Sequence, residues 1–194
     1  MRACEEHSQA NKENMSVNKI SKNYVTSLVS ELPFNILLPT ALIRLLVAGV
    51  MYGPFRALVD TGAQPSLLSA AVQAKCKMAV MPNRRSIVGI EGRSFGIKHQ
   101  VQAKVYPWFE SERCIDETFW VLPSESTWRP VIPSSGMSKI TTVRGVEGNW
   151  ADPEYWNPRP VDVLLGARAV AKAITGVEQE QGALILKSIF GHII

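Results

Sequence analysis

The sequence has few cysteines, and none is arranged for a disulfide framework or a metal site. Cys4, Cys76 and Cys114 are odd in number, lie far apart and form no Cys-x-x-Cys pair. This argues against a disulfide scaffold and against a zinc site built from this chain alone. Cys4 and His7 are close enough in sequence to share a metal, but two ligands do not make a site. We therefore expect no metal or other cofactor, and a reducing, intracellular setting.

The sequence also lacks a hydrophobic run long enough to cross a membrane. The longest apolar stretch, Ile36 to Tyr52, is interrupted by Pro39 and Arg44. It is shorter than the ~18–20 residues that a spanning helix needs. The N-terminus is acidic and has no apolar segment of the kind that directs export. These absences predict a soluble protein with no membrane partner.

The positive charge of the chain is not arranged like a nucleic-acid surface. The net charge is +4, and between positions 75 and 113 eight basic residues outnumber three acidic ones. A nucleic-acid groove combines clustered basic residues with interleaved aromatic ones. Only a few aromatic residues lie nearby, namely Phe95, Tyr106, Trp108 and Phe109. We expect a solvated basic face and no nucleic-acid partner for this domain.

Composition divides the chain into a tail, a domain and an extension. Residues 1–35 are polar and predict a flexible tail or linker. Residues 36–176 carry short apolar runs separated by Gly and Pro, which predicts one mostly β domain with one or two short helices. Within it, residues 124–160 are Pro-rich and aperiodic, which indicates a long loop or insertion. Residues 177–194 are expected to form a C-terminal extension.

Several segments have strand patterns. "ALIRLLVAGVMY" and "FRALVD", separated by Gly53-Pro54, predict two strands joined by a turn. Apolar and polar residues alternate from Ile97 to Val105, with His99 on the apolar side, which predicts a half-buried strand after a Gly-rich hairpin. "ETFWVLP" predicts another strand.

Two segments indicate helices. "SLLSAAVQAK" follows Pro65 and predicts a short helical segment, since Pro is tolerated in a first helical turn. "VDVLLGARAVAKAITG" predicts a short apolar strand, a Gly turn and a helix that Gly176 closes.

One candidate active site is a serine in the pattern G-x-S-x-G. Ser94 lies between Gly92 and Gly96 and would act as a nucleophile, with His192 as a possible base. That pattern requires a strand before the serine and a helix after it. The residues that follow Gly96 alternate with period two and therefore predict a strand. The sequence favours a flexible glycine hairpin here over a serine hydrolase.

The second candidate is an aspartate at the end of an apolar run, in "RALVDTGAQPSLLS". Asp60 is followed at once by Thr61 and Gly62. Aspartic proteases present a carboxylate on a tight loop in this way, and a glycine lets the backbone approach a partner closely. The alternative is an ordinary turn at a strand end.

Peptide hydrolysis by carboxylates requires two of them around one water molecule. One takes a proton from the water and the other gives a proton to the substrate, and close like charges keep one proton between them. No other aspartate of the chain is followed by Thr-Gly or Ser-Gly. The second carboxylate must therefore come from a second copy, in a homodimer whose two-fold axis passes between the two Asp60 side chains.

The order of these motifs resembles the retroviral-type, or retropepsin-like, aspartic proteases. The motifs are "RALVDTGAQPSLLS", "IVGIEGRSFG" and "VDVLLGA". More narrowly, "LLPTALIRLLV", "ADPEYWNPRPVDVLLGA" and "LKSIFGHII" resemble the protease region of BEL/Pao-type retrotransposon polyproteins. The resemblance runs from about residue 36 to the C-terminus. It implies a retropepsin-like closed β-barrel, an endopeptidase that cleaves an extended polyprotein segment, and a location in the cytoplasm or in retrotransposon particles.

The resemblance also implies roles for residues of the loop that carries the aspartate. Asp60 would be the catalytic acid and base, and Thr61 would support the pair of aspartates across the dimer. Gly62 and Ala63 would line the substrate backbone.

Two further elements follow from the resemblance. A flap from Gly89 to Gly96 would close over the substrate and add main-chain hydrogen bonds to it. Its substrate-binding residues would be Gly89, Ile90, Glu91 and Gly92. The active-site loop would be supported from behind by Leu164, Leu165 and Gly166.

The chain departs from the family pattern at two positions. Arg168 stands where the family has an acidic residue, and His192 stands where it has a tryptophan. An inactive retropepsin-like module, kept for binding or assembly, is therefore the alternative to an active protease.

Overall fold

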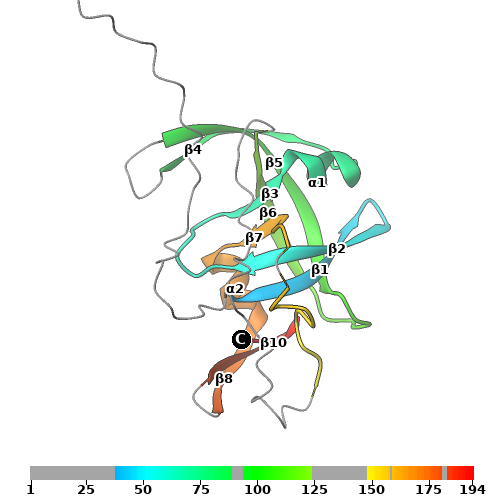
Figure 1. Cartoon of the computed structure of the whole chain (residues 1–194). Coiled ribbons are helices and arrows are strands. Elements are labelled where there is room, and N and C mark those ends of the chain that lie inside the picture. Colours follow the sequence, from blue (N-terminus) through cyan, green and yellow to red (C-terminus); the bar gives the residue numbers. More distant parts are fainter. Residues whose placement is uncertain (1–37, 89–93, 124–147, 158, 181–182) are drawn as a thin grey trace, which may run out of the picture.

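The chain folds into a mostly β structure with two short helices. The computed structural model describes residues 38–88, 94–123, 148–157, 159–180 and 183–194 (Figure 1). In chain order the elements are β1 Thr40–Val47, β2 Val50–Val59, β3 Ser66–Ser69, α1 Ala70–Lys75, β4 Met81–Val88, β5 Ser94–Pro107, β6 Ile115–Leu122, β7 Val163–Leu165, α2 Ala167–Ala173, β8 Ile174–Glu180, β9 Ala183–Ser188 and β10 Gly191–Ile193.

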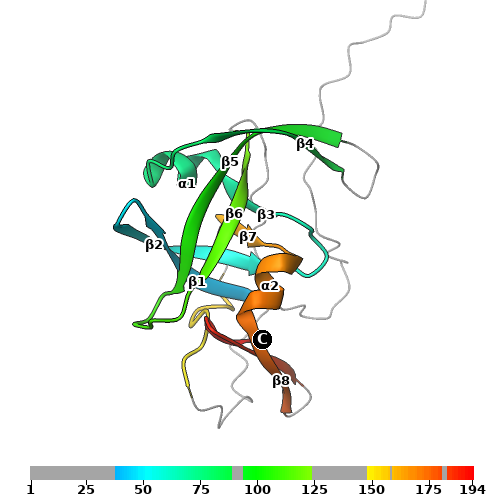
Figure 2. The ribbon, with the colours of Figure 1, turned by 180° about the vertical axis from the view of Figure 1, so that it is seen from behind.

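The larger sheet closes on itself. Its strand order is β1-β2-β7-β3-β6-β5-β4, and β1 also pairs with β5. The ring therefore contains six strands, and β4 extends β5 beyond it (Figures 1 and 2). Closure leaves the ring without free edges. This strand order and the two short helices confirm the fold class predicted from the sequence.

The alternation predicted for residues 97–105 is found in β5. Val101 and Val105 are fully buried in the barrel core, while Gln102 between them is exposed. His99, which the same alternation places on the apolar side, is exposed. It pairs with Val121 of β6 on one side and with Pro82 of β4 on the other.

The turn between the first two strands lies earlier than predicted. It is formed by Ala48 and Gly49, not by Gly53-Pro54. Ala48 has a φ of 47° and Gly49 a φ of 80°, and the tight two-residue turns that match strand twist need positive φ at both positions. Gly53 and Pro54 instead lie inside β2, beside the register shift between Ile43 and Leu45.

Both predicted helices form, with different bounds. The segment after Pro65 begins as a strand, β3, because it pairs in parallel with β6. The helix α1 begins only after Ser69, whose hydroxyl accepts a hydrogen bond from the backbone N–H of Val72. The helix α2 ends at Ala173 and not at Gly176, since Ile174 is already extended, with φ −72° and ψ 130°.

The C-terminal residues form a second sheet in the order β10-β9-β8. In both views it lies at the end of the barrel away from β4 (Figures 1 and 2). Phe190 and Ile193 pack into the barrel core, so this part of the extension shares the core of the domain. The domain boundary predicted at residue 176 falls inside β8.

The described part of the predicted insertion packs against the barrel. The backbone N–H of Leu42 donates to the carbonyl oxygen of Ala151 at 2.7 Å. The backbone N–H of Ala151 in turn donates to the carbonyl oxygen of His192 at 2.8 Å. Ala151 and Asp152 are buried. The predictions for residues 1–35 and 124–147 lie outside the described residues. Within the described part of the chain, no helix is both long and apolar enough to cross a membrane.

Candidate active site

Asp60 lies where β2 leaves the barrel. Residues Phe55–Val59 are all buried, and the strand pairs in parallel with β7. The backbone N–H of Asp60 continues this pairing and donates to the carbonyl oxygen of Leu165 at 3.0 Å. The Asp60 side chain is half-buried. The barrel therefore fixes the backbone of Asp60 while leaving its carboxylate accessible.

The residues after Asp60 form a tight loop. The backbone N–H of Gly62 donates to Asp60 Oδ1 at 2.8 Å, which fixes the orientation of the carboxylate relative to its own backbone. Thr61 and Gly62 are exposed, and Ala63 is half-buried. We refer to residues 60–65 as the Asp60 loop.

The β7–α2 junction lies directly against the Asp60 loop. The backbone N–H of Ala167 donates to the carbonyl oxygen of Ala63 at 2.8 Å. A Cβ atom on Gly166 would lie 2.5 Å from the carbonyl oxygen of Pro65, closer than van der Waals contact allows. Only glycine fits at this position without moving the loop. Leu165 and Gly166 therefore lie against the Asp60 loop, and Leu164 precedes them in β7, in register with Leu58 and Leu67.

The predicted flap lies only partly within the described residues. Gly89, Ile90, Glu91 and Gly92 are outside them. The strands on either side, β4 and β5, pair antiparallel up to Val88 opposite Ser94. Ser94 therefore begins a strand, and the helix that a serine nucleophile elbow requires after its serine is not present here.

A buried polar chain beside the Asp60 loop was not predicted from the sequence. The backbone N–H of Gly166 donates to Ser66 Oγ at 3.1 Å, and Ser66 Oγ donates to Glu117 Oε1 at 3.2 Å. Lys172 Nζ lies 3.1 Å from Glu117 Oε2. A glutamate in the alternating apolar row of β6 was the signal in the sequence, because a charge at a core-facing position is rarely left there without a partner.

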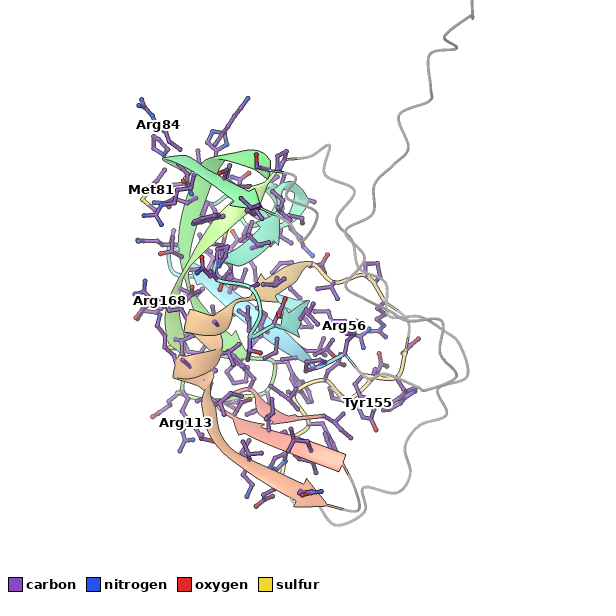
Figure 3. All side chains as sticks on the ribbon, turned by 90° about the vertical axis from the view of Figure 1, so that its left-hand side faces the viewer. Arg56, Met81, Arg84, Arg113, Tyr155 and Arg168 are labelled. Carbon is purple, nitrogen blue, oxygen red and sulfur yellow. The ribbon has the colours of Figure 1, made fainter. Side chains whose placement is uncertain are left out.

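A second unpredicted cluster joins β2 to the segment 148–157. Arg56 Nε lies 2.6 Å from Asp152 Oδ2, and both side chains are buried. Arg56 also donates to the carbonyl oxygens of Asn157 at 2.7 Å and Glu154 at 2.6 Å. Figure 3 shows Arg56 on the same side of the molecule as Tyr155 of this segment. The Arg56 guanidinium thus fixes residues 152–157 against β2, the strand that ends next to Asp60.

The two departures from the family pattern differ in their surroundings. Arg168 is exposed in the first turn of α2, a turn that holds no acidic residue, and it projects from the helix in Figure 3. A positive charge is unfavourable near a helix N-terminus. The ring of His192 lies edge-on to Trp150, with 6.2 Å between ring centroids. His192 thus occupies an aromatic packing position.

Within the described ranges, no three His, Cys, Asp or Glu side chains gather as a metal site would require. Cys76 is buried at the end of α1. Burial raises the pKa of its thiol, although the nearby Lys75 acts in the opposite direction. The Cys76 thiol is therefore protonated and unreactive at neutral pH.

Of the comparisons with known proteins, only the one with solved structures finds a similarity. No protein-family model matches the chain, and no curated protein matches it. Among solved structures, the chain is similar to the retroviral protease-like domain of Ddi1 from Leishmania major. The two have a TM-score of 0.39 and 13% sequence identity, over 81% of this chain and 91% of that one. A likeness this distant assigns no activity or residue role to this chain.

Proposed function

We propose that the chain is an aspartic endopeptidase that acts as a homodimer. The observation that carries the proposal is the setting of Asp60, a single accessible carboxylate on a loop that hydrogen bonds fix to the β7–α2 junction. Such a group can take a proton from water or give one to a peptide, provided that a second carboxyl shares the task.

Two other aspartates of the described chain, Asp152 and Asp116, are engaged in ion pairs elsewhere. Asp152 is buried in its ion pair with Arg56. Asp116 is exposed on β6 and pairs with Lys104 at 3.2 Å. Neither stands on a Thr-Gly loop like that of Asp60. A second Asp60, supplied by another copy across a two-fold axis, is therefore the partner that we propose.

The substrate of this dimer would be an extended peptide. In the proposal it lies between the Asp60 loops and the flap segments that follow β4, and gains main-chain hydrogen bonds as an added strand does. The sequence resemblance favours an origin in a BEL/Pao-type retrotransposon and a polyprotein as the natural substrate. It also favours a place of action in the cytoplasm or in retrotransposon particles.

Cleavage of a mixed peptide library by the purified protein tests the proposal. We expect cleavage within the range from about pH 4 to 7, because the reaction needs one protonated and one ionised carboxyl. The activity should disappear in Asp60→Asn and in the presence of a statine-type transition-state mimic. Asp116→Asn is the matched control, since it neutralises an exposed carboxylate elsewhere. Equal cleavage by wild type and Asp60→Asn would contradict the mechanism.

An inactive module is the second candidate, and Arg168 is the observation that favours it. The arginine places a positive charge in the first turn of α2, directly after Ala167, whose backbone N–H donates to Ala63 of the Asp60 loop. In an inactive module, Asp60→Asn would leave binding or assembly unchanged and no variant would cleave peptides. Arg168→Asp, which restores the acidic residue of the family pattern, would raise activity in a weakly active protease and change nothing in an inactive module.

A further inference from the structure

The starting point is a carboxylate at an inward-facing position of β6. The strand alternates buried and more exposed residues, and Glu117 takes its place in the buried row between Ile115 and Phe119. Its side chain is only 5% exposed. Removing a carboxylate from water costs several kcal/mol unless hydrogen bonds and an opposite charge replace the lost hydration. Glu117 therefore depends on specific partners.

One partner is Ser66, the first residue of β3 and the residue after the Asp60 loop. Its side chain is buried, and its hydroxyl has two roles. It donates to Glu117 Oε1 and accepts the hydrogen bond from the backbone N–H of Gly166. A hydroxyl has one hydrogen to donate. Because the Glu117 carboxylate accepts this hydrogen, the lone pairs of Ser66 Oγ are free to accept the hydrogen bond from Gly166. Glu117 thus fixes the direction in which Ser66 meets the β7–α2 junction.

The other partner is Lys172, in the last turn of α2. Its Nζ contacts Glu117 Oε2 at 3.1 Å and donates to the backbone oxygen of Asp116 at 2.5 Å. The same helix begins next to Gly166. The chain from Ser66 through Glu117 to Lys172 therefore ties both ends of α2, one to Ser66 directly after the Asp60 loop and one to β6.

We propose that Ser66, Glu117 and Lys172 are positioning residues for the Asp60 loop, an inference that rests on the proposed function. Stability alone does not account for them, because well-packed apolar residues often replace a buried ion pair without loss. Together they hold the backbone of Gly166 in place next to the Asp60 loop. Leu165, the residue before Gly166, accepts the hydrogen bond from the backbone N–H of Asp60. Displacing a catalytic group by about 1 Å can lower a rate on the order of 100-fold.

Amide hydrogen exchange of the full-length protein tests the hold on the loop without any need for activity. In Ser66→Ala the Gly166 amide loses its acceptor, and we expect it to exchange at least about tenfold faster, while amides paired between β8 and β9 keep their rates. Ser66→Thr keeps the hydroxyl and should restore the protection. Where Ser66→Ala does not fold, Glu117→Gln carries the same test, with Asp116→Asn on the same strand as its control.

Two results of the exchange experiment would overturn the proposal. One is equal protection of Gly166 in wild type and in folded Ser66→Ala. The other is faster exchange spread evenly over β8 and β9, because this would mean a general loss of stability.

Kinetics then separate positioning from substrate binding. We expect kcat to fall about 10- to 100-fold in Ser66→Ala with KM nearly unchanged, and to recover in Ser66→Thr. A rise in KM with unchanged kcat would contradict a positioning role. If Gly166 alone loses protection in Ser66→Ala but no variant, including wild type, cleaves peptides, the proposed function is contradicted. The positioning of the Asp60 loop by Ser66 would then still stand.

Discussion

The backbone N–H of Asp60 donates a hydrogen bond to the carbonyl oxygen of Leu165, over 3.0 Å. This bond joins two motifs that are far apart in the sequence, the Asp-Thr-Gly loop and the apolar segment that precedes α2. It also extends the parallel pairing of β2 with β7 by one step. The position of the candidate catalytic carboxylate is therefore set by the barrel itself, and changes at the β7–α2 junction should be felt at Asp60.

Gly166→Ala is expected to destabilise the protein and to impair the site. The new Cβ would lie 2.5 Å from the carbonyl oxygen of Pro65 and 2.9 Å from that of Ala63, both backbone atoms. We expect the free energy of unfolding to fall by about 1–3 kcal/mol, the usual cost of overpacking. Urea denaturation measures it. Gly96→Ala is the control, since a Cβ there meets no atom within 4 Å, and an equal loss in both variants would contradict the close approach.

Arg56→Met is expected to be among the most destabilising substitutions. It would leave Asp152 buried without its opposite charge, at a cost of about 3–5 kcal/mol in the free energy of unfolding. Adding Asp152→Leu should recover part of this loss, because the uncompensated charge is then gone. Thermal and urea unfolding provide the measurement. Lys104→Met, which breaks an exposed ion pair, should cost far less.

Ala48→Asn is expected to stabilise the first hairpin. Ala48 has a φ of 47° and precedes Gly49, and Asn-Gly is the preferred pair for a turn with two positive φ angles. We expect a gain of about 0.5–1 kcal/mol in the free energy of unfolding, since asparagine tolerates this region better than alanine. Ala48→Val should have the opposite sign, because a β-branched residue is strained there. A loss of stability with asparagine would show that the turn has another geometry.

Cys76 is expected to resist modification as long as the protein is folded. Its thiol is buried with a raised pKa, whereas Cys114 is half-buried. N-ethylmaleimide followed by peptide mass spectrometry should find Cys114 labelled in the native protein, and Cys76 labelled only in urea. The free energy of unfolding should also fall as the pH rises above about 8.5, because the unfolded thiol ionises there before the folded one does. Rapid native labelling of Cys76 would contradict its burial.

Local patterns in the sequence were sufficient for much of this fold. The period-two alternation around Val101, the apolar run that ends at Asp60 and the Gly after Leu165 all reflect short-range constraints. Each of them gave the right element. The first turn was predicted wrongly because Gly53-Pro54 is a strong turn signal by composition, while the backbone at Ala48 and Gly49 provides the twist that a tight hairpin needs.

The contacts that fix the site were beyond such patterns. Ser66 meets Glu117, and Arg56 meets Asp152, only after distant strands have paired. No hydrophobic periodicity or residue spacing in a single sequence identifies these pairs. It does show that Glu117 stands in an apolar row, and a charge at such a position indicates a buried partner without identifying it.

Subunit mixing tests the central claim most directly, because it asks whether one active site needs two Asp60 side chains. Wild type is mixed with increasing amounts of Asp60→Asn under conditions that allow subunits to exchange, and cleavage per wild-type chain is recorded. In an equal mixture only about one quarter of randomly paired dimers hold two aspartates, so activity per wild-type chain should fall to about half. Mixing with Asp116→Asn should cause no such fall. Activity per wild-type chain that stays constant at every ratio of Asp60→Asn would contradict a site shared between two copies.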